Sequence, residues 1–186
     1  MARLPYLDAA DLREEDRDLL ARPINLNRAL AHSIPSSRNF WEMGNWIRFG
    51  ATVDRRLREM AILQVGYVTR SAYEWSHHLQ LAMTDFGVSP DDVRAIIAES
   101  EGRESGLPAL DRAVLRLARE MTADLAGSRE AFDVIRDGLG HEQLTELVVI
   151  IGFYNLVVRY LLTMEVDVEA AYLPYLEQFP LPVSGG

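Results

Sequence analysis

The stretch Asp54–Gly87, DRRLREMAILQVGYVTRSAYEWSHHLQLAMTDFG, contains two helix-like runs, and several of the chain's most reactive side chains lie close together in it. Glu59 lies early in the first run, and Glu74 and His78 lie on the second. Side chains four residues apart face the same side of a helix, so we expect Glu74 and His78 to be neighbours, with Ser71 one turn before them. A carboxylate beside an imidazole is suited to proton transfer, because each group shifts the pKa of the other towards neutrality. This pair is therefore the first candidate for a catalytic site.

The surroundings of Glu59 leave two alternatives open. The run 57–68 is apolar on most sides, which indicates a buried helix in which a carboxylate needs a partner or a raised pKa. Alternatively, Glu59 pairs with Arg55 or Arg56 on an exposed edge. The second run carries large apolar side chains on most of its faces. This pattern favours burial of its Glu/His cluster over a turn of solvent-exposed charges.

Helical periodicity continues along the rest of the chain, and no strand alternation appears. We expect an aromatic-rich packing helix over residues 37–49 and a long, buried helix over residues 141–166. The polar Gly/Pro segment 100–108 is expected to be a surface loop, because neither side of it looks able to fold alone. The sequence therefore predicts a single all-α domain. Its expected parts are an N-terminal arm with short helices (1–35), the helical domain (36–172) and an extended, partly mobile tail (173–186).

Composition excludes several classes of function. With 186 residues, a hydrophobic fraction of 48% and a charged fraction of 25%, the chain suits one ordinary globular domain. A net charge of -9 argues against partners such as nucleic acids and anionic membranes. The absence of cysteine removes disulfides and thiol chemistry, and the absence of lysine removes Schiff-base chemistry on a side-chain amine.

The expected location is the cytoplasm. The N-terminal segment MARLPYLDAADLREED contains no apolar core of signal-peptide length. The longest apolar run, Leu147–Val158, lies between two charged residues and is too short to cross a bilayer. We therefore expect a soluble protein that does not associate with membranes.

A metal site is a rival to proton transfer. Glu74 and His77 form a Glu-x-x-His motif, the spacing that di-iron helical bundles use. Such bundles need a second copy on another helix, and neither histidine outside this stretch has a glutamate three residues before it. A mononuclear site formed by Glu59, Glu74 and His78 stays open, although no cofactor is expected.

Three motifs along the chain resemble one known family. Leu57-Arg58-Glu59 opens an apolar helix, Tyr73-Glu74-Trp75-Ser76-His77-His78 follows, and Gly87-Val88-Ser89 precedes an acidic helix start. Together they resemble the carboxymuconolactone decarboxylase family, which also includes the alkylhydroperoxidase AhpD-like proteins. The close resemblance covers about residues 40–120, and the long C-terminal helix fits the same all-helical architecture. The resemblance implies an AhpD-like helical fold.

The redox branch of that family has a glutamate, eleven residues, a cysteine, two residues, a second cysteine, three residues and a histidine. On this chain Glu59 matches the glutamate and His78 the histidine, whereas Ser71 and Glu74 occupy the cysteine positions. Both thiols are missing, so peroxide reduction by a Cys-x-x-Cys pair is chemically impossible. The decarboxylase branch carries Glu-x-x-x-His, as Glu74 and His78 do here.

The resemblance implies a cofactor-independent decarboxylase, a carbon–carbon lyase, acting on a small carboxylated lactone or related acid. We expect His78 to donate a proton to the carbanion left by carbon dioxide, with Glu74 orienting it and Glu59 acting as relay or second acid/base. The side chains expected to form the substrate pocket are Ser71, Tyr73, Trp75 and His77. An arginine should hold the substrate carboxylate, and the candidates are Arg70 and Arg159.

The family also implies a homo-oligomer, a trimer or a hexamer, with sites near subunit interfaces. The tryptophan-rich segment 40–49 agrees with such an assembly. Two other functions stay open: a metal-dependent enzyme that uses Glu59, Glu74 and His78, and a non-catalytic helical oligomer that binds a ligand. A solvent-exposed His78 with no adjoining cavity would favour the non-catalytic oligomer.

Overall fold

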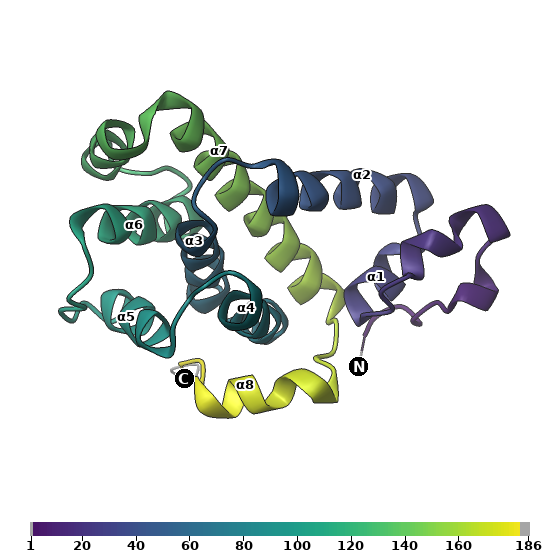
Figure 1. Cartoon of the computed structure of the whole chain (residues 1–186). Coiled ribbons are helices and arrows are strands. Elements are labelled where there is room, and N and C mark those ends of the chain that lie inside the picture. Colours follow the sequence, from purple (N-terminus) through teal and green to yellow (C-terminus); the bar gives the residue numbers. More distant parts are fainter. Residues whose placement is uncertain (1, 183–186) are drawn as a thin grey trace.

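The computed structural model describes residues 2–182, and every regular element within that range is a helix. The predicted single all-α domain is confirmed (Figure 1). In chain order the elements are η1 (Ala9–Asp11), η2 (Glu14–Leu20), α1 (Asn25–Leu30), α2 (Ile34–Asn45), the π-helix η3 (Trp46–Gly50), α3 (Arg55–Val68), α4 (Ala72–Asp85), α5 (Pro90–Ser100), α6 (Ala109–Ala123), α7 (Arg129–Met164), η4 (Ala170–Tyr172) and α8 (Leu173–Gln178).

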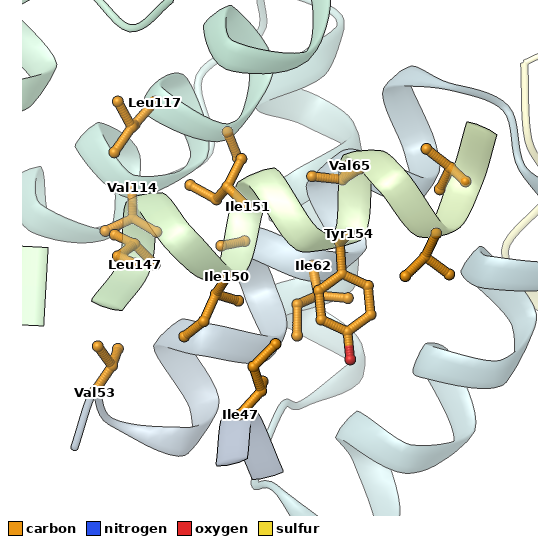
Figure 2. Packing of buried hydrophobic residues seen from close by; sticks show 14 of the residues in the cluster. Ile47, Val53, Ile62, Val65, Val114, Leu117, Leu147, Ile150, Ile151 and Tyr154 are labelled. Carbon is orange, nitrogen blue, oxygen red and sulfur yellow. The ribbon is translucent and has the colours of Figure 1, made fainter. Parts of the chain in front are cut away.

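Helices α3, α6 and α7 form the centre of the fold, and α7 runs diagonally across the molecule (Figure 1). Their contact is made by aliphatic side chains that are at most 2% exposed: Ile62, Val65, Val114, Leu117, Ile150 and Ile151 (Figure 2). Full burial of one such side chain contributes about 1.5–3 kcal/mol, so this cluster is the main source of stability. Tyr154 of α7 lies beside the cluster, and its hydroxyl oxygen points away from the aliphatic side chains (Figure 2).

Helix α7 is divided by Gly140, whose φ of 78° is not helical. The part after this kink corresponds to the predicted long helix over residues 141–166. By length and composition alone α7 is apolar enough to cross a membrane, with a mean hydropathy of 1.9 in its most apolar window. Its packing against α3 and α6 explains that composition, because a central helix needs apolar side chains around most of its circumference. Helix α7 is therefore the central helix of this fold.

The short turn 69–71 joins α3 to α4, and a glycine lets the two helices approach closely. A Cβ atom at Gly66 would lie 3.2 Å from the backbone nitrogen of Trp75 and 3.6 Å from Cγ of Glu74. A larger residue at this position would push α4 outward. The close approach brings the side chains of α3 and α4 together in the interior.

Both ends of the described chain are held against the helical body. The N-terminal arm is fixed to the end of α7, since Arg3 N–H donates to the Met164 carbonyl at 2.9 Å. The tail differs from the prediction of an extended segment over 173–186. Leu173–Gln178 form α8, which packs under α4, and Phe179 is 4% exposed (Figure 1). The tail folds back because Phe179 joins a buried apolar cluster with residues of α3, α4 and α5. Residues 183–186 lie outside the described range.

Candidate active site

Two side-chain caps fix where the site-bearing helices begin. Asp54 accepts a hydrogen bond from Leu57 N–H at 3.0 Å at the start of α3. Ser71 accepts one from Glu74 N–H at 3.5 Å at the start of α4. Each cap satisfies a backbone donor that the first helical turn leaves free. The structure thus gives Ser71, one of the expected pocket residues, a role in starting α4.

Glu59, Glu74 and His78 meet in the interior. His78 lies between the two carboxylates: Nδ1 is 2.8 Å from Glu59 Oε2 and Nε2 is 3.0 Å from Glu74 Oε1. The exposed fractions are 2% for Glu59, 3% for Glu74 and 9% for His78. The structure therefore contradicts the alternative in which Glu59 pairs with Arg55 or Arg56 on an exposed edge. Nor is His78 solvent-exposed, the arrangement that would favour a non-catalytic oligomer.

The two contacts of His78 differ in kind. The Nδ1–H group donates a directed hydrogen bond to Glu59, which fixes the orientation of the ring. The approach to Glu74 is an ion-pair contact in which the Nε2–H bond does not point at the oxygen. Oε1 of Glu74 is buried and has no hydrogen-bond partner within residues 2–182. A buried carboxyl oxygen in this state is available to a substrate.

Burial and neighbouring charges shift the pKa values of Glu74 and His78. It raises the pKa of Glu74 to about 7, an effect that nearby His78 opposes and Glu59 reinforces. Burial lowers the pKa of His78, but the negative charges of Glu74 and Glu59 outweigh burial and hold that pKa above its usual value. Two neighbouring groups that exchange protons near neutral pH are what general acid–base catalysis requires.

A small cavity of about 90 Å³ opens onto Glu74 and His78. Aromatic rings form much of its wall: Phe40, Trp41, Tyr73, Phe153 and Tyr154. Tyr154 meets the His78 ring edge-on, with the ring centroids 4.9 Å apart. Glu59 is not among the lining residues, so it acts on the cavity through its hydrogen bond with His78 and through the effect of its charge on Glu74.

Of the four residues expected in the substrate pocket, Tyr73 and His77 line the cavity, whereas Ser71 and Trp75 do not. Trp75 is fully buried on another face of α4, where its Nε1–H donates to the Phe179 carbonyl at 2.8 Å. Neighbouring helix positions are about 100° apart around the axis, so Trp75 faces away from the wall that Glu74 lines. We therefore assign Trp75 to the core.

His77 lies at the edge of the cavity in a second, separate cluster. Its ring is stacked between Tyr73 and Tyr172, with centroids 4.0 Å and 3.5 Å away. His77 Nε2 lies 2.8 Å from Glu169 Oε2, a residue 92 positions further along the chain. Burial lowers the pKa of His77 although Glu169 raises it. This arrangement ties α4 to the C-terminal segment and gives His77 a positioning role.

Arg70 and Arg159, the expected anchors for a substrate carboxylate, do not line the cavity. Arg70 is exposed in the turn before α4, and Arg159 donates to Asn155 of its own helix. The lining instead includes Arg22, which precedes α1, and Arg48 of the π-helix η3. Sequence reasoning missed both, because nothing local marks an arginine as facing a cavity built from four distant segments.

The geometry argues against the mononuclear metal alternative. Glu59 approaches Nδ1 of His78 and Glu74 approaches Nε2, so the two carboxylates lie on opposite sides of one ring. A single ion bound to either nitrogen would reach only one of the carboxylates. Within residues 2–182, no group of three His, Asp or Glu side chains is arranged to hold a metal ion.

Comparison with known proteins connects this site to a family. Residues 37–120, which include Glu59, Glu74 and His78, match the carboxymuconolactone decarboxylase family. No curated protein matches the chain. The chain contains no cysteine, so the thiol pair of the redox branch is absent.

Three solved structures share the fold. An uncharacterized peroxidase-related protein from Ralstonia eutropha JMP134, described as an alkylhydroperoxidase AhpD core, has a TM-score of 0.77 at 18% identity over 97% of this chain and 98% of its own. A variant of the debrominase Bmp8, in complex with 2,3,4-tribromopyrrole, has a TM-score of 0.78 at 15% identity over 96% and 100%. An uncharacterized peroxidase-related protein from Silicibacter sp. TM1040 has a TM-score of 0.61 at 20% identity over 78% and 76%.

These structures confirm the AhpD-like fold. The family match covers the segment that carries the buried glutamates and His78. Residues 37–120 of this chain, which has no Cys-x-x-Cys pair, therefore match the carboxymuconolactone decarboxylase family.

Proposed function

We propose that this protein is a cofactor-independent decarboxylase that acts in the cytoplasm on a small carboxylated lactone or a related acid. The observation that carries the proposal is the pairing of Glu74 and His78 at the wall of a small cavity, where the pKa of Glu74 is about 7. Loss of carbon dioxide leaves a carbanion that needs a proton donor active near neutral pH. The family membership of residues 37–120 supports the same chemistry.

In the proposed step, the bond between the substrate carbon and its carboxylate breaks heterolytically. Carbon dioxide leaves, and the electron pair stays on the substrate as a carbanion delocalised into the adjoining unsaturated system. A proton held by the Glu74–His78 pair is transferred to that carbon, which forms the new carbon–hydrogen bond. One proton from solvent restores the pair, so each turnover consumes one proton and releases one carbon dioxide.

The contacts favour a division of roles that differs from the one expected from the sequence. Glu59 is the residue that orients His78, since it accepts the Nδ1–H hydrogen bond from outside the cavity. Glu74 lines the cavity and has a free buried oxygen. We therefore assign proton donation to Glu74 together with His78, and orientation to Glu59.

A direct assay tests the proposal. The full-length protein is incubated with a carboxylated muconolactone, and release of carbon dioxide is measured beside the loss of substrate. We expect Glu74→Gln and His78→Gln each to lower kcat by about 10²–10⁴-fold, the usual contribution of a positioned acid or base. Glu142→Gln and His141→Gln change exposed residues of α7 and serve as matched controls. Full activity in His78→Gln, or no turnover of any carboxylated lactone by the wild type, would overturn the proposal.

We also propose that the protein forms a homo-oligomer, a trimer or a hexamer. Large apolar side chains stay exposed on a face made by α2, η3 and α7: Met43 (36%), Phe49 (75%), Val149 (40%) and Leu156 (54%). A face of this kind is typical of a surface covered by another subunit. Arg48 of the cavity lies next to Phe49, so this assembly would adjoin the site.

A further inference from the structure

Two positively charged side chains line the cavity without a negatively charged partner. No carboxylate of residues 2–182 lies within ion-pair distance of Arg48, whose guanidinium carbon lies 6.0 Å from the centroid of the Phe49 ring. Arg22 donates only to the hydroxyl of Tyr172, at 3.2 Å. Many other arginines of this acidic chain form ion pairs. Two guanidinium groups without a carboxylate partner therefore lie at one cavity, beside the Glu74–His78 pair.

A third donor at the same cavity also lacks a partner. Trp41 lines the cavity, and its Nε1–H group is buried without an acceptor among residues 2–182. A buried donor left unpaired costs about 1–3 kcal/mol, which a ligand that supplies an acceptor recovers. Arg22, Arg48 and Trp41 offer donors only, so the group that they suit is an acceptor with negative charge.

The backbone that carries Arg48 is held in an unusual conformation. Segment η3 is a π-helix in which Ala51 N–H donates to the Trp46 carbonyl at 2.9 Å. The buried Arg58 of α3 donates to the carbonyl of Ile47 at 2.5 Å, which fixes this turn against α3. Single π turns occur often at functional sites, and a fixed backbone lowers the cost of ordering Arg48 around a ligand.

Charge decides which part of the substrate these donors hold. A carboxylate that leaves as carbon dioxide loses its negative charge in the transition state, so an arginine bound to it would stabilise the ground state instead. The arginines are thus suited to an anionic group that stays on the product. The aromatic walls include Phe40 and Phe153, whose ring centroids are 4.9 Å apart. Such walls suit a ligand with a flat ring between its anionic group and its reacting carbon.

We propose that Arg48, Arg22 and the Nε1–H of Trp41 form an anion subsite that anchors a small planar ligand by a carboxylate or similar group remote from its reacting carbon. Its use in turnover rests on the proposed function, whereas binding of the anion does not. The subsite makes charge a determinant of specificity: an anionic ring is selected over its neutral isostere.

Binding of two unreactive probes to the full-length protein tests this subsite. Calorimetric titration compares 2-furoate with its neutral isostere 2-furamide. We expect the wild type to bind 2-furoate at least about tenfold more tightly, which is about 1.4 kcal/mol. Arg48→Gln should lose that preference through weaker binding of 2-furoate alone, and Arg48→Lys should keep part of it. Arg129→Gln, at a side chain that is 88% exposed, is the matched control and should bind like the wild type.

Equal binding of the two probes to the wild type, no saturable binding of 2-furoate, or an undiminished preference in a folded Arg48→Gln would each overturn the subsite. Trp41→Phe keeps the aromatic wall and removes the donor, so it should weaken 2-furoate binding by a smaller factor. The outcome is separable from catalysis. A protein that binds 2-furoate through Arg48 but decarboxylates no lactone keeps the subsite and loses the proposed function. If the protein decarboxylates a lactone and Arg48→Gln leaves the KM unchanged, the proposed function stands and the role of the subsite in turnover is refuted.

Discussion

Arg58 and Glu59 are consecutive in the sequence, and their side chains stay together in the protein interior, with Arg58 Nε 3.8 Å from Glu59 Oε1. Arg58 is 1% exposed and packs its guanidinium over the Phe86 ring, 5.2 Å from the centroid. Burial lowers the pKa of Arg58, although the charge of Glu59 raises it. A buried positive charge thus lies behind the carboxylate that orients His78.

Arg58→Ala should strongly destabilise the protein. The substitution leaves the buried Glu59 carboxylate with His78 but without Arg58 and opens a cavity, and breaking a buried pair in this way costs about 3–5 kcal/mol. Urea unfolding at pH 7 measures the loss. Arg55→Ala, at an exposed position of the same helix, should stay within about 0.5 kcal/mol of the wild type. Arg58→Met refills the space and should lose less than Arg58→Ala. An unchanged urea midpoint for Arg58→Ala would mean that the pair contributes nothing to stability.

The raised pKa of Glu74 predicts how stability depends on pH. Because its folded-state pKa of about 7 exceeds the ordinary 4.5, folded Glu74 binds its proton more tightly than unfolded Glu74 does. Its contribution is fully present below about pH 4.5 and is lost as the pH rises to about 7, at roughly 1.4 kcal/mol per pKa unit. His78, whose pKa is also raised, loses its contribution as the pH rises above 6.5.

Glu74→Gln cannot lose a proton, so it should gain stability relative to the wild type as the pH rises from about 5 to about 8. Urea midpoints of the two proteins, measured side by side across this range, give the difference. Other carboxylates affect both proteins equally and cancel. A difference that does not vary with pH would show that Glu74 titrates normally in the folded protein.

Glu59→Gln should impair turnover without impairing substrate binding. Glu59 does not line the cavity, so the substitution leaves the cavity wall unchanged and removes the charge that holds Nδ1–H of His78 and faces Arg58. We expect kcat to fall by about 10²–10⁴-fold while KM changes little, and Glu59→Asp to recover part of the rate. Steady-state kinetics and the pH profile of kcat measure the effect. A raised KM with normal kcat would instead indicate that Glu59 contacts the substrate.

Phe179→Ala tests whether the C-terminal segment is an integral part of the fold. The Phe179 side chain is 4% exposed, and its carbonyl accepts the indole hydrogen bond of Trp75 at 2.8 Å. Removal of a buried phenylalanine side chain costs about 3–5 kcal/mol. Thermal and urea unfolding should show this loss, and Gln178→Ala at the exposed neighbouring position should show almost none. Equal stability of the two variants would mean that the tail is not docked in solution.

The exposed apolar face predicts a response of the assembly to a single charge. Leu156→Glu places a carboxylate on the face formed by α2, η3 and α7, where burial against another subunit would cost several kcal/mol. Sedimentation velocity should show an oligomer for the wild type and a smaller species for Leu156→Glu. Leu125→Glu, at a leucine that is 82% exposed in the turn after α6, is the control. A monomeric wild type would refute the proposed oligomer.

Local sequence was sufficient for much of the fold. The α3 and α4 helices follow from short-range hydrogen bonds and from a 3.6-residue period, whereas the role of Ser71 as the cap of α4 emerged only from the structure. The contact of Glu74 with His78 follows from their spacing of four on one helix. The absence of any thiol follows from composition alone. These features depend on residues close in the chain, whose relative positions the helix itself fixes.

Tertiary structure decided which other side chains share the cavity. The partner of His77 is Glu169, 92 residues away, and the donors Arg22 and Arg48 come from segments outside α3 and α4. Trp75 adjoins Glu74 in sequence, yet its side chain lies in a buried apolar cluster with Phe179 and does not line the cavity. Periodicity identifies which face of a helix is apolar, but it carries no information about which distant segment covers that face. That choice depends on how all helices pack at once, so only the folded structure supplies it.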